Sequence, residues 1–383
     1  MTVTQIGKFY PPYRGGMETH LETLSQELRK TTDVKVLVAN DCWKTTETIQ
    51  DGVPVTRLGT CCSISSAPVC PSLVTRLRND DSDIVHIHLP NPTAIVAYLA
   101  SSHRGHLVLT YHSDVVRQKH LERAFRPILL NAIRRSSAVI CSSPNYIESS
   151  PILREFRHLC RVIPLGIRVE SFDRYDPAAV DRIRREHGPA IVLAVGRLVY
   201  YKGLEYLIRA MSTVDAKLLI IGCGPLREQL EKEVERLGFE SRVTLMGEID
   251  DIVPYYHAAD VFVLPSIART EAFGIVQLEA MACSKPVINT NLESGVPFVS
   301  LNGVTGLTVK PRSSAELSRA MRLLFSDPGL RKQYGRSGRI RVETKFDLSL
   351  MTRRTLDLYS ELMSVRATSQ PPVAALRSAA ISQ

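Results

Sequence analysis

The chain has 383 residues, of which 44% are hydrophobic and 23% charged. At about 100–200 residues per domain, this length and composition predict two globular domains, each with its own core. No apolar run reaches the roughly 18 residues of a membrane-spanning helix, and Met1 to Ile6 have no long apolar signal region. We therefore expect a chain that does not cross a membrane.

The charge is unevenly placed along the chain. The net charge is +9, and residues 101–170 hold 11 Lys or Arg against 5 Asp or Glu. Excess positive charge favours an anionic partner, either nucleic acid, an acidic membrane face or a phosphorylated substrate, with simple solvation as the alternative. The basic residues are spread along a predicted helix, unlike a nucleic-acid-binding tract: Arg117, Lys119, Arg123, Arg126, Arg134 and Arg135.

Short apolar segments alternate with helical segments in the first half of the chain. Strands are predicted at 3–7, 34–39, 84–88, 107–111 and 138–141, and a helix at 18–30 has its leucines on one face. A second series begins near residue 190. Its predicted strands are 190–195, 217–221, 243–246, 261–264 and 286–289, with helices at 226–237 and 275–282.

Alternating strands and helices predict an α/β chain with parallel sheets and helices on both sheet faces. We place the domain boundary near 165–188. The predicted domains are residues 1–168, joined by a helix at about 346–365 that packs back, and residues 169–345. Residues 366–383 are rich in Ser and Ala with two adjacent prolines, and we expect a disordered tail there.

The segment E-A-F-G-I-V-Q-L-E places Glu271 and Glu279 eight residues apart. Glu271 is expected in the loop before a helix, and Glu279 about one turn inside it. Free backbone N–H groups at the start of a helix attract phosphate. The backbone N–H groups of Phe273, Gly274 and Ile275 are therefore suited to bind a diphosphate. The two carboxylates suit sugar hydroxyls and a ribose diol. An ordinary capping Glu and a solvent-facing Glu are the alternative.

Basic residues and glycines follow two other predicted strands. Gly196-Arg197 ends one strand, and Lys202-Gly203 follows before a helix, so that two cations can hold one diphosphate through charge-assisted bonds. Two unrelated surface charges are the alternative. Gly222-x-Gly224-Pro225 ends the next strand, but Arg227 stands where a dinucleotide fingerprint needs a third glycine. We interpret Gly222 as a turn residue.

The N-terminal half offers a glycine loop and histidines. Gly15 and Gly16 follow the first strand and permit close approach to a phosphate or sugar, unless they lie in a plain surface loop. His112 follows a buried strand, where side chains reach the ligand crevice of an open α/β sheet. His86 and His88 alternate along one strand near Asp83. Core histidines are favoured over a metal site there, and we predict no metal.

Together these segments resemble glycosyltransferase family four, which has the GT-B fold of two Rossmann-like parallel-sheet lobes facing a cleft. The resemblance runs from Gly7 to about Glu361. It implies that Arg197 and Lys202 neutralise the donor diphosphate, that Glu271 contacts the transferred sugar and that Glu279 contacts the ribose. It also implies that Gly16 lets one lobe close over the phosphates, that His112 lies beside the anomeric carbon and that the backbone at Gly247 to Ile249 receives the base.

The match G-K-F-Y-P-P-Y-R-G-G-M-E-T-H at 7–20, with S-G-V-P at 294–297, is similar to bacterial mannosyltransferases of exopolysaccharide and O-antigen assembly. This implies a retaining α-mannosyltransferase that uses GDP-mannose and a polyprenyl-diphosphate-linked saccharide. It also implies no cofactor and a cytoplasmic enzyme held peripherally at the inner face of the cytoplasmic membrane. Two residues depart from the pattern, Arg168 in place of an acidic residue and Ser284 in place of glycine.

Two other readings remain open from the sequence. An epimerase of the same fold would act on one bound nucleotide sugar without an acceptor. A non-catalytic subunit would only bind the nucleotide sugar or would scaffold an assembly complex. The eight cysteines form no C-x-x-C pair or zinc spacing, which fits a reducing compartment. Cys61, Cys62 and Cys70 lie in Thr60 to Ser72, an expected acceptor-side loop, and no chemistry is inferred for them.

Overall fold

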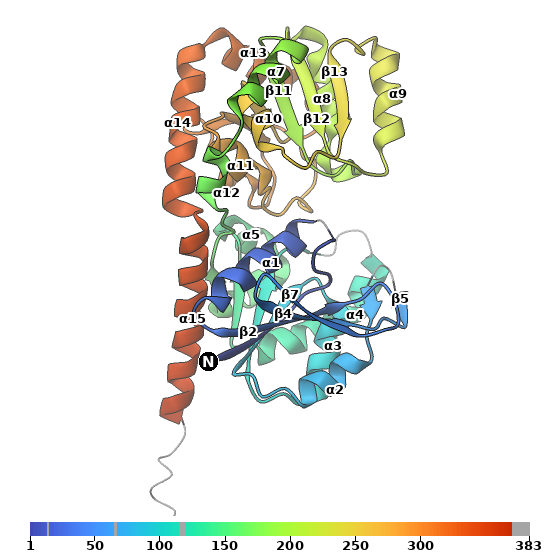
Figure 1. Cartoon of the computed structure of the whole chain (residues 1–383), viewed down its shortest axis with the longest axis vertical. Coiled ribbons are helices and arrows are strands. Elements are labelled where there is room, and N and C mark those ends of the chain that lie inside the picture. The colour runs from blue at the N-terminus through green and yellow to red at the C-terminus, as the bar shows by residue number, and fades with distance from the viewer. Residues whose placement is uncertain (14, 65–66, 115–118, 370–383) are drawn as a thin grey trace, which may run out of the picture. The chain divides into compact units, whose positions relative to one another are not determined.

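The structure is a computed structural model that describes residues 1–13, 15–64, 67–114 and 119–369. Contacts divide the chain into two compact units (Figure 1). The first contains Met1–Thr110, Phe125–Val139 and the segment from Thr352, and the second contains Tyr111–Ala124 and Ile140–Met351. This division assigns residues 111–124 and 140–168 to the second unit, whereas the sequence placed them in the first domain. The boundary near residue 168 stays a prediction.

One sheet has eight strands, and its central strands belong to the first unit. The strands β7, β1, β2 and β4 pair in parallel, and β3 runs antiparallel to β4 at the edge of the sheet. In sheet order the strands are β10 (Cys160–Val162), β9 (Ala138–Cys141), β8 (His106–Tyr111), β7 (Ile84–Leu89), β1 (Thr2–Ile6), β2 (Asp33–Ala39), β4 (Val53–Leu58) and β3 (Thr46–Gln50). The helices of this part of the chain are α1 (Gly16–Arg29), α2 (Ser72–Arg78), α3 (Pro92–Ser101), α4 (Lys119–Arg135), α5 (Pro144–Ser149) and α6 (Pro151–Glu155).

The expected loop at Thr60 to Ser72 contains an antiparallel pair, β5 (Cys62–Ile64) and β6 (Ala67–Val69), which the sequence analysis did not predict. Residues 65 and 66 lie outside the described chain. Cys61 and Cys62 are exposed and Cys70 is half-buried.

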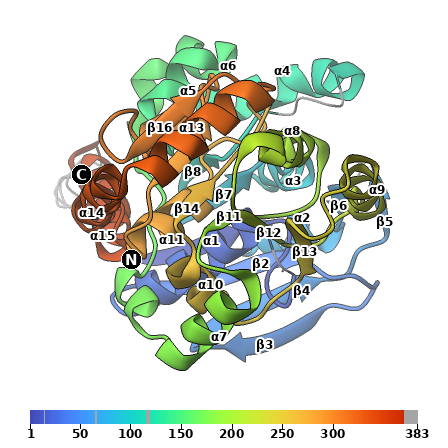
Figure 2. The same ribbon diagram turned by 90° about the horizontal axis from the view of Figure 1, so that it is seen from above.

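The second sheet has six strands, and each strand is parallel to its neighbours. In sheet order they are β13 (Val243–Gly247), β12 (Lys217–Ile221), β11 (Ile191–Val195), β14 (Val261–Val263), β15 (Val287–Thr290) and β16 (Gly306–Val309). The helices are α7 (Pro177–His187), α8 (Leu204–Ala210), α9 (Arg227–Leu237), α10 (Val253–Ala258), α11 (Val276–Ala282), α12 (Val296–Val299), α13 (Ser314–Ser326) and α14 (Pro328–Lys345). Figure 2 shows β11, β12 and β13 side by side, with α9 beside β13.

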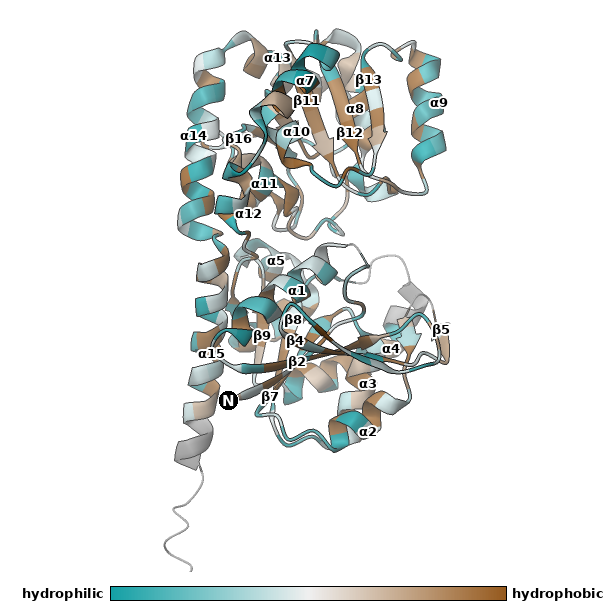
Figure 3. Cartoon of the chain, viewed as in Figure 1, coloured by the Kyte–Doolittle hydropathy of each residue, from teal (hydrophilic) through white to brown (hydrophobic). Residues whose placement is uncertain are grey.

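Both faces of the second sheet are buried, as the continuous apolar runs predict. Successive residues of β11 enter different clusters: Ile191 and Leu193 join one, and Val192 and Ala194 join the other. Because side chains alternate across a strand, these clusters are the two faces of the sheet. Figure 3 shows this apolar character along β11 and β12, while much of α14 is hydrophilic.

A last helix, α15 (Leu348–Ser369), returns to the first unit. The Tyr359 hydroxyl lies 2.6 Å from His86 Nδ1 and accepts a hydrogen bond of 3.0 Å from Gln5 Nε2. All three side chains are buried. The helix extends past residue 365, into the expected tail, and residues 370–383 lie outside the described chain.

Across the described residues, no helix combines the length and apolar character that crossing a membrane requires.

Candidate functional site

Three glycines meet at the carboxyl ends of neighbouring strands in the second unit. Gly196 follows β11, Gly222 follows β12 and Gly247 ends β13. The Gly222 N–H donates to the Gly247 carbonyl at 2.7 Å, and a Cβ on Gly222 would lie 2.2 Å from the Gly196 carbonyl oxygen. Gly222 also has φ +138°, which favours glycine. The structure therefore gives Gly222 the role in backbone geometry that the sequence analysis assigned to it.

Lys202 and Glu271 form a buried ion pair beside these glycines. Lys202 ends the 3-10 turn Tyr200–Lys202, and its Nζ lies 2.6 Å from Glu271 Oε2. The two side chains are 11% and 10% exposed. The Ser266 hydroxyl donates to the same carboxylate oxygen at 3.1 Å. A Cβ on Gly196 would lie 3.1 Å from the Lys202 ammonium nitrogen, so the glycine leaves room for this side chain.

Arg197 adds a second positive charge to this group. Its side chain is exposed, one residue beyond Gly196. Burial and the charge of Glu271 raise the pKa of Tyr201, while the charges of Lys202 and Arg197 act to lower it. Both cations and the carboxylate therefore act on the same phenol. Two positive charges in one group favour an anionic ligand.

Glu279 is the fourth residue of α11, about one turn inside the helix, as predicted. The Tyr256 hydroxyl of α10 donates to Glu279 Oε2 at 2.5 Å. Burial raises the pKa of Glu279, against the hydrogen bond from Tyr256 and the positive charge of Lys202. Glu271 and Glu279 thus both lie within the electrostatic reach of one ammonium group.

The residues before α11 pack into the core of the second unit. Phe273 is buried, with its ring 6.0 Å from that of Phe346. Gly274 has φ +73°, and Ile275 immediately precedes the helix, so the turn expected there is present. Ile249, two residues after β13, packs partly buried against the same core. The ligand contacts expected at these four residues stay predictions.

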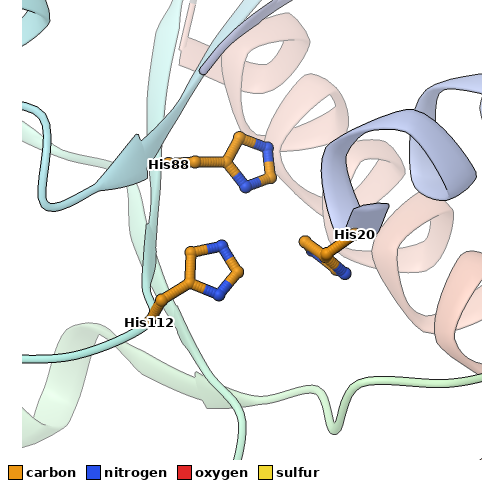
Figure 4. A group of neighbouring side chains, drawn as sticks. All are labelled: His20, His88 and His112. Atoms are coloured by element: carbon orange, nitrogen blue, oxygen red, sulfur yellow. The ribbon is translucent and has the colours of Figure 1, made fainter. Parts of the chain in front are cut away.

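His112 follows β8 and is buried. Figure 4 shows it with His20 of α1 and His88 of β7, and one ring nitrogen of each lies within 4.8 Å of the others. The Nε2 atom of His88 lies 2.8 Å from the side-chain oxygen of Gln5. Burial lowers the pKa of His20 to about 4, so this imidazole is neutral at pH 7. Buried neutral imidazoles can donate or accept hydrogen bonds, as recognition of sugar hydroxyls requires.

The histidine pair near Asp83 is buried in the first unit, and the absence of a metal there stays a prediction. The rings of His86 and His88 stack on one side of β7, with centroids 4.6 Å apart. His86 bonds to Tyr359 and, through Nε2 at 2.6 Å, to Thr110 Oγ1. The Asp83 carboxylate accepts instead from the Thr2 backbone N–H at 2.8 Å.

Gly15 and Gly16 begin α1 in the first unit. Gly15 is the N-cap residue, and a Cβ there would lie 2.4 Å from a Glu18 carboxylate oxygen. At Gly16 a Cβ would meet no atom within 4 Å. A side chain at Gly16 therefore has room in this structure, and its expected approach to a phosphate stays a prediction. Arg14, the residue before this pair, lies outside the described residues.

The partners of the two carboxylates were not predicted from the sequence. Ser266 and Tyr256 hold Glu271 and Glu279, and Arg269 forms an ion pair of 2.6 Å with Asp114. Ser266 and Tyr256 belong to apolar segments without a recognisable motif. Arg269 and Asp114 are 155 residues apart in the chain, so no spacing rule connects them.

Comparisons with known proteins agree with this fold. The family described as Glycosyltransferase Family 4 matches residues 14–171, and the family described as Glycosyl transferases group 1 matches residues 178–341. The HepE protein of Anabaena, solved with UDP, covers 94% of this chain and 100% of its own at a TM-score of 0.78 and 22% identity. At this identity the structural likeness concerns the fold.

Curated relatives extend the agreement to the level of sequence. The D-rhamnosyltransferase WbpZ of Pseudomonas aeruginosa is 33% identical over 268 residues, which is 70% of each chain. The O-antigen chain mannosyltransferase C of Escherichia coli is 29% identical over 96% of this chain and 100% of its own. Two family matches in succession, relatives of this similarity and two parallel sheets of this topology show that the chain belongs to the family four glycosyltransferases of the GT-B fold.

Proposed function

We propose that this glycosyltransferase transfers mannose from GDP-mannose, with retention of configuration, to a lipid-linked saccharide during bacterial cell-surface polysaccharide synthesis. The observation that carries the proposal is the buried pair of Lys202 and Glu271 beside Gly196. It combines a cation for a diphosphate with a carboxylate for sugar hydroxyls in one group. The similarity to an O-antigen chain mannosyltransferase over nearly the whole chain supports the choice of sugar and pathway.

The proposed donor lies along the second unit. Lys202 and Arg197 neutralise the diphosphate, helped by backbone N–H groups at Phe273 to Ile275, and Glu279 accepts from the ribose. The base lies against the backbone of Gly247 to Ile249, after the strand end that Gly222 shapes. The positive charges of Lys202 and Arg197 suit an anionic ligand. Gly196, Gly222 and Gly247 have no side chains that would keep such a ligand from the main chain.

Transfer proceeds on one face of the sugar. The acceptor hydroxyl oxygen bonds to the anomeric carbon as the bond from that carbon to the diphosphate oxygen breaks. The leaving phosphate takes the hydroxyl proton, and Lys202 and Arg197 stabilise the negative charge that develops on it. Glu271 holds the sugar, His112 lies beside the anomeric carbon, and the loop at Gly15 and Gly16 covers the phosphates. Exclusion of water limits hydrolysis of the donor.

The proposed acceptor is a polyprenyl-diphosphate-linked saccharide at the inner face of the cytoplasmic membrane. Four basic residues of α4 are exposed: Arg123, Arg126, Arg134 and Arg135. Arg117 and the side chain of Lys119 lie outside the described residues. Each basic residue near an anionic surface contributes about 1 kcal/mol to binding. Flotation with vesicles that contain anionic lipid tests this, and equal binding to neutral vesicles contradicts it.

A binding and turnover screen tests the donor. Thermal shifts of the full chain are measured with GDP, UDP, ADP and their sugar conjugates, followed by transfer of labelled mannose to a membrane extract. A selective shift with GDP and GDP-mannose, together with lipid-extractable label, is expected. A selective shift with UDP or ADP sugars overturns the donor. Conversion of the sugar without an acceptor indicates an epimerase. A shift without turnover indicates a non-catalytic binding subunit, and absence of any shift indicates a scaffold protein.

A further inference from the structure

Arg269 and Asp114 form an ion pair that the proposed reaction does not yet use. Both belong to the second unit. Arg269 Nη2 donates to Asp114 Oδ2 at 2.6 Å, and Arg269 Nη1 donates to the Ser149 carbonyl at 2.9 Å. The other oxygen of Asp114 accepts from the Tyr111 hydroxyl at 2.6 Å and from the Ser150 hydroxyl at 3.1 Å. Both carboxylate oxygens are thus bound.

Tyr146 of α5 joins the same group. The Arg269 guanidinium lies over the Tyr146 ring, with its Cζ atom 5.5 Å from the ring centroid. The Tyr146 hydroxyl accepts a hydrogen bond from the Asp114 backbone N–H at 2.7 Å. The Arg269 and Asp114 side chains are 25% and 19% exposed. Exposed ion pairs contribute little because water solvates each charge separately. Here two charge-assisted bonds, one to a carboxylate and one to a carbonyl, and an aromatic ring hold one guanidinium, which fixes its position far better.

This pair connects two short segments that each carry a residue of the proposed site. His112 lies two residues before Asp114, and Glu271 lies two residues after Arg269. Two residues of extended chain span at most about 7 Å, so a displacement of either ion-pair partner is transmitted to its neighbour. The Glu271 backbone N–H also donates to the Ala268 carbonyl at 3.0 Å, so Arg269 lies within the turn that presents Glu271.

We propose that Arg269 is a positioning residue for sugar transfer: its bonds to Asp114 and Ser149 fix the separation between His112 and Glu271. This inference rests on the proposed function, in which those two side chains contact the transferred sugar. Arg269 itself contacts no substrate in this proposal. A displacement of about 1 Å at a reacting centre lowers turnover roughly 100-fold, so a small loss of fixation has a measurable effect.

The test uses Arg269→Met and Arg269→Lys in the full chain. Three quantities are measured: kcat at saturating donor, affinity for the nucleoside diphosphate alone, and the midpoint of thermal unfolding. Arg269→Met is expected to lower kcat about 10–100-fold while nucleotide affinity stays within about twofold. Arg269→Lys keeps the charge but not the fork that reaches both Asp114 and Ser149, and it should recover only part of kcat.

Arg339→Met is the matched control. Arg339 binds both oxygens of Asp173 at 2.7 and 2.8 Å and the Ala282 carbonyl at 2.7 Å. The Arg339→Met variant therefore loses a comparable set of bonds in the same unit, and we expect it to have an unchanged kcat and a somewhat lower thermal stability. A similar fall in kcat for this control would mean that any lost arginine bridge slows the enzyme, and would overturn the proposal.

Three other outcomes decide the matter. Unchanged kcat in Arg269→Met contradicts a positioning role. Parallel loss of kcat, nucleotide affinity and thermal stability in both Arg269 variants indicates a structural role only, and also overturns the inference. Failure of the proposed function appears separately, because the unaltered protein would then show no turnover with any nucleotide sugar, and the inference would fall with it.

Discussion

Loss of the Lys202 ammonium should weaken nucleoside-diphosphate binding in a way that loss of Glu271 does not. Lys202 Nζ is 2.6 Å from Glu271 Oε2, so a diphosphate that binds this ammonium must share or replace that contact. A hydrogen bond to a charged group contributes about 1.5–3 kcal/mol. Lys202→Ala should therefore raise the dissociation constant for GDP or UDP roughly 10–150-fold, because about 1.4 kcal/mol corresponds to a factor of ten.

Glu271→Gln keeps the size of the side chain and removes the negative charge that competes with the diphosphate. We expect equal or tighter nucleotide binding and a large loss of turnover, because the carboxylate is assigned to the sugar. Calorimetric titration of nucleoside diphosphate at constant salt measures the binding. Lys217→Ala is the control for net charge. Lys217 begins β12, at the end of the strand away from Gly222, and donates a hydrogen bond to the Ser241 carbonyl.

Protein stability needs a separate check in this experiment. Lys202→Ala leaves the Glu271 carboxylate buried without its cation, which lowers the free energy of unfolding by about 3–5 kcal/mol. Lys202→Met combined with Glu271→Gln removes both charges and should recover most of that loss. Wild-type nucleotide affinity in folded Lys202→Ala would refute the role of Lys202. A loss in Glu271→Gln as large as that in Lys202→Ala would refute the competition.

Three further predictions concern stability. Burial raises the folded-state pKa of Glu279 above its unfolded value, so the folded chain holds the proton more tightly. This residue therefore lowers the free energy of unfolding as pH rises from about 4.3 towards the folded pKa. Urea unfolding across that range should show a free energy of unfolding that depends less on pH in Glu279→Gln. Ser284 has φ +54°, so Ser284→Gly should raise the free energy of unfolding by about 0.5–1 kcal/mol, and an unchanged melting temperature would argue against strain at this turn. Gly222→Ala should lower the free energy of unfolding by about 3 kcal/mol or more, because the new Cβ meets the Gly196 carbonyl. Gly238→Ala, at φ +66° without a close neighbour, should lower it by only about 1 kcal/mol. Equal losses of stability in thermal unfolding would exclude the Gly196 contact as the cause of the Gly222→Ala effect.

The sequence predicted the central strands because their runs are continuous and apolar. The strand Lys217–Ile221 was predicted to the residue, and Ala138–Cys141 likewise. It missed β4, which lies inside the sheet, and also the edge strands β3, β10 and β16 and the short pair β5 and β6. Edge strands of this kind bury little apolar surface, so they leave no strong pattern.

The candidate site was predictable where function depends on residues close in sequence. The loop position of Glu271 and the helical position of Glu279 follow from eight residues of pattern. The Lys202–Glu271 pair was not predicted, because each residue was assigned to a different part of the ligand and their 2.6 Å contact depends on the packing of separate loops. The Arg269–Asp114 pair depends on tertiary structure in the same way.

The return of α15 to the first unit has a consequence for the order of events during synthesis. The buried Gln5 amide and His86 imidazole find their common partner in Tyr359, more than 270 residues later than either. A nascent chain that has just emerged from the ribosome as far as β9 cannot satisfy these groups, and an unmade buried hydrogen bond costs about 1–3 kcal/mol. The second unit is complete at Met351, whereas the first needs the segment from Thr352, so we expect the first unit, although its synthesis begins earlier, not to be completed before the second.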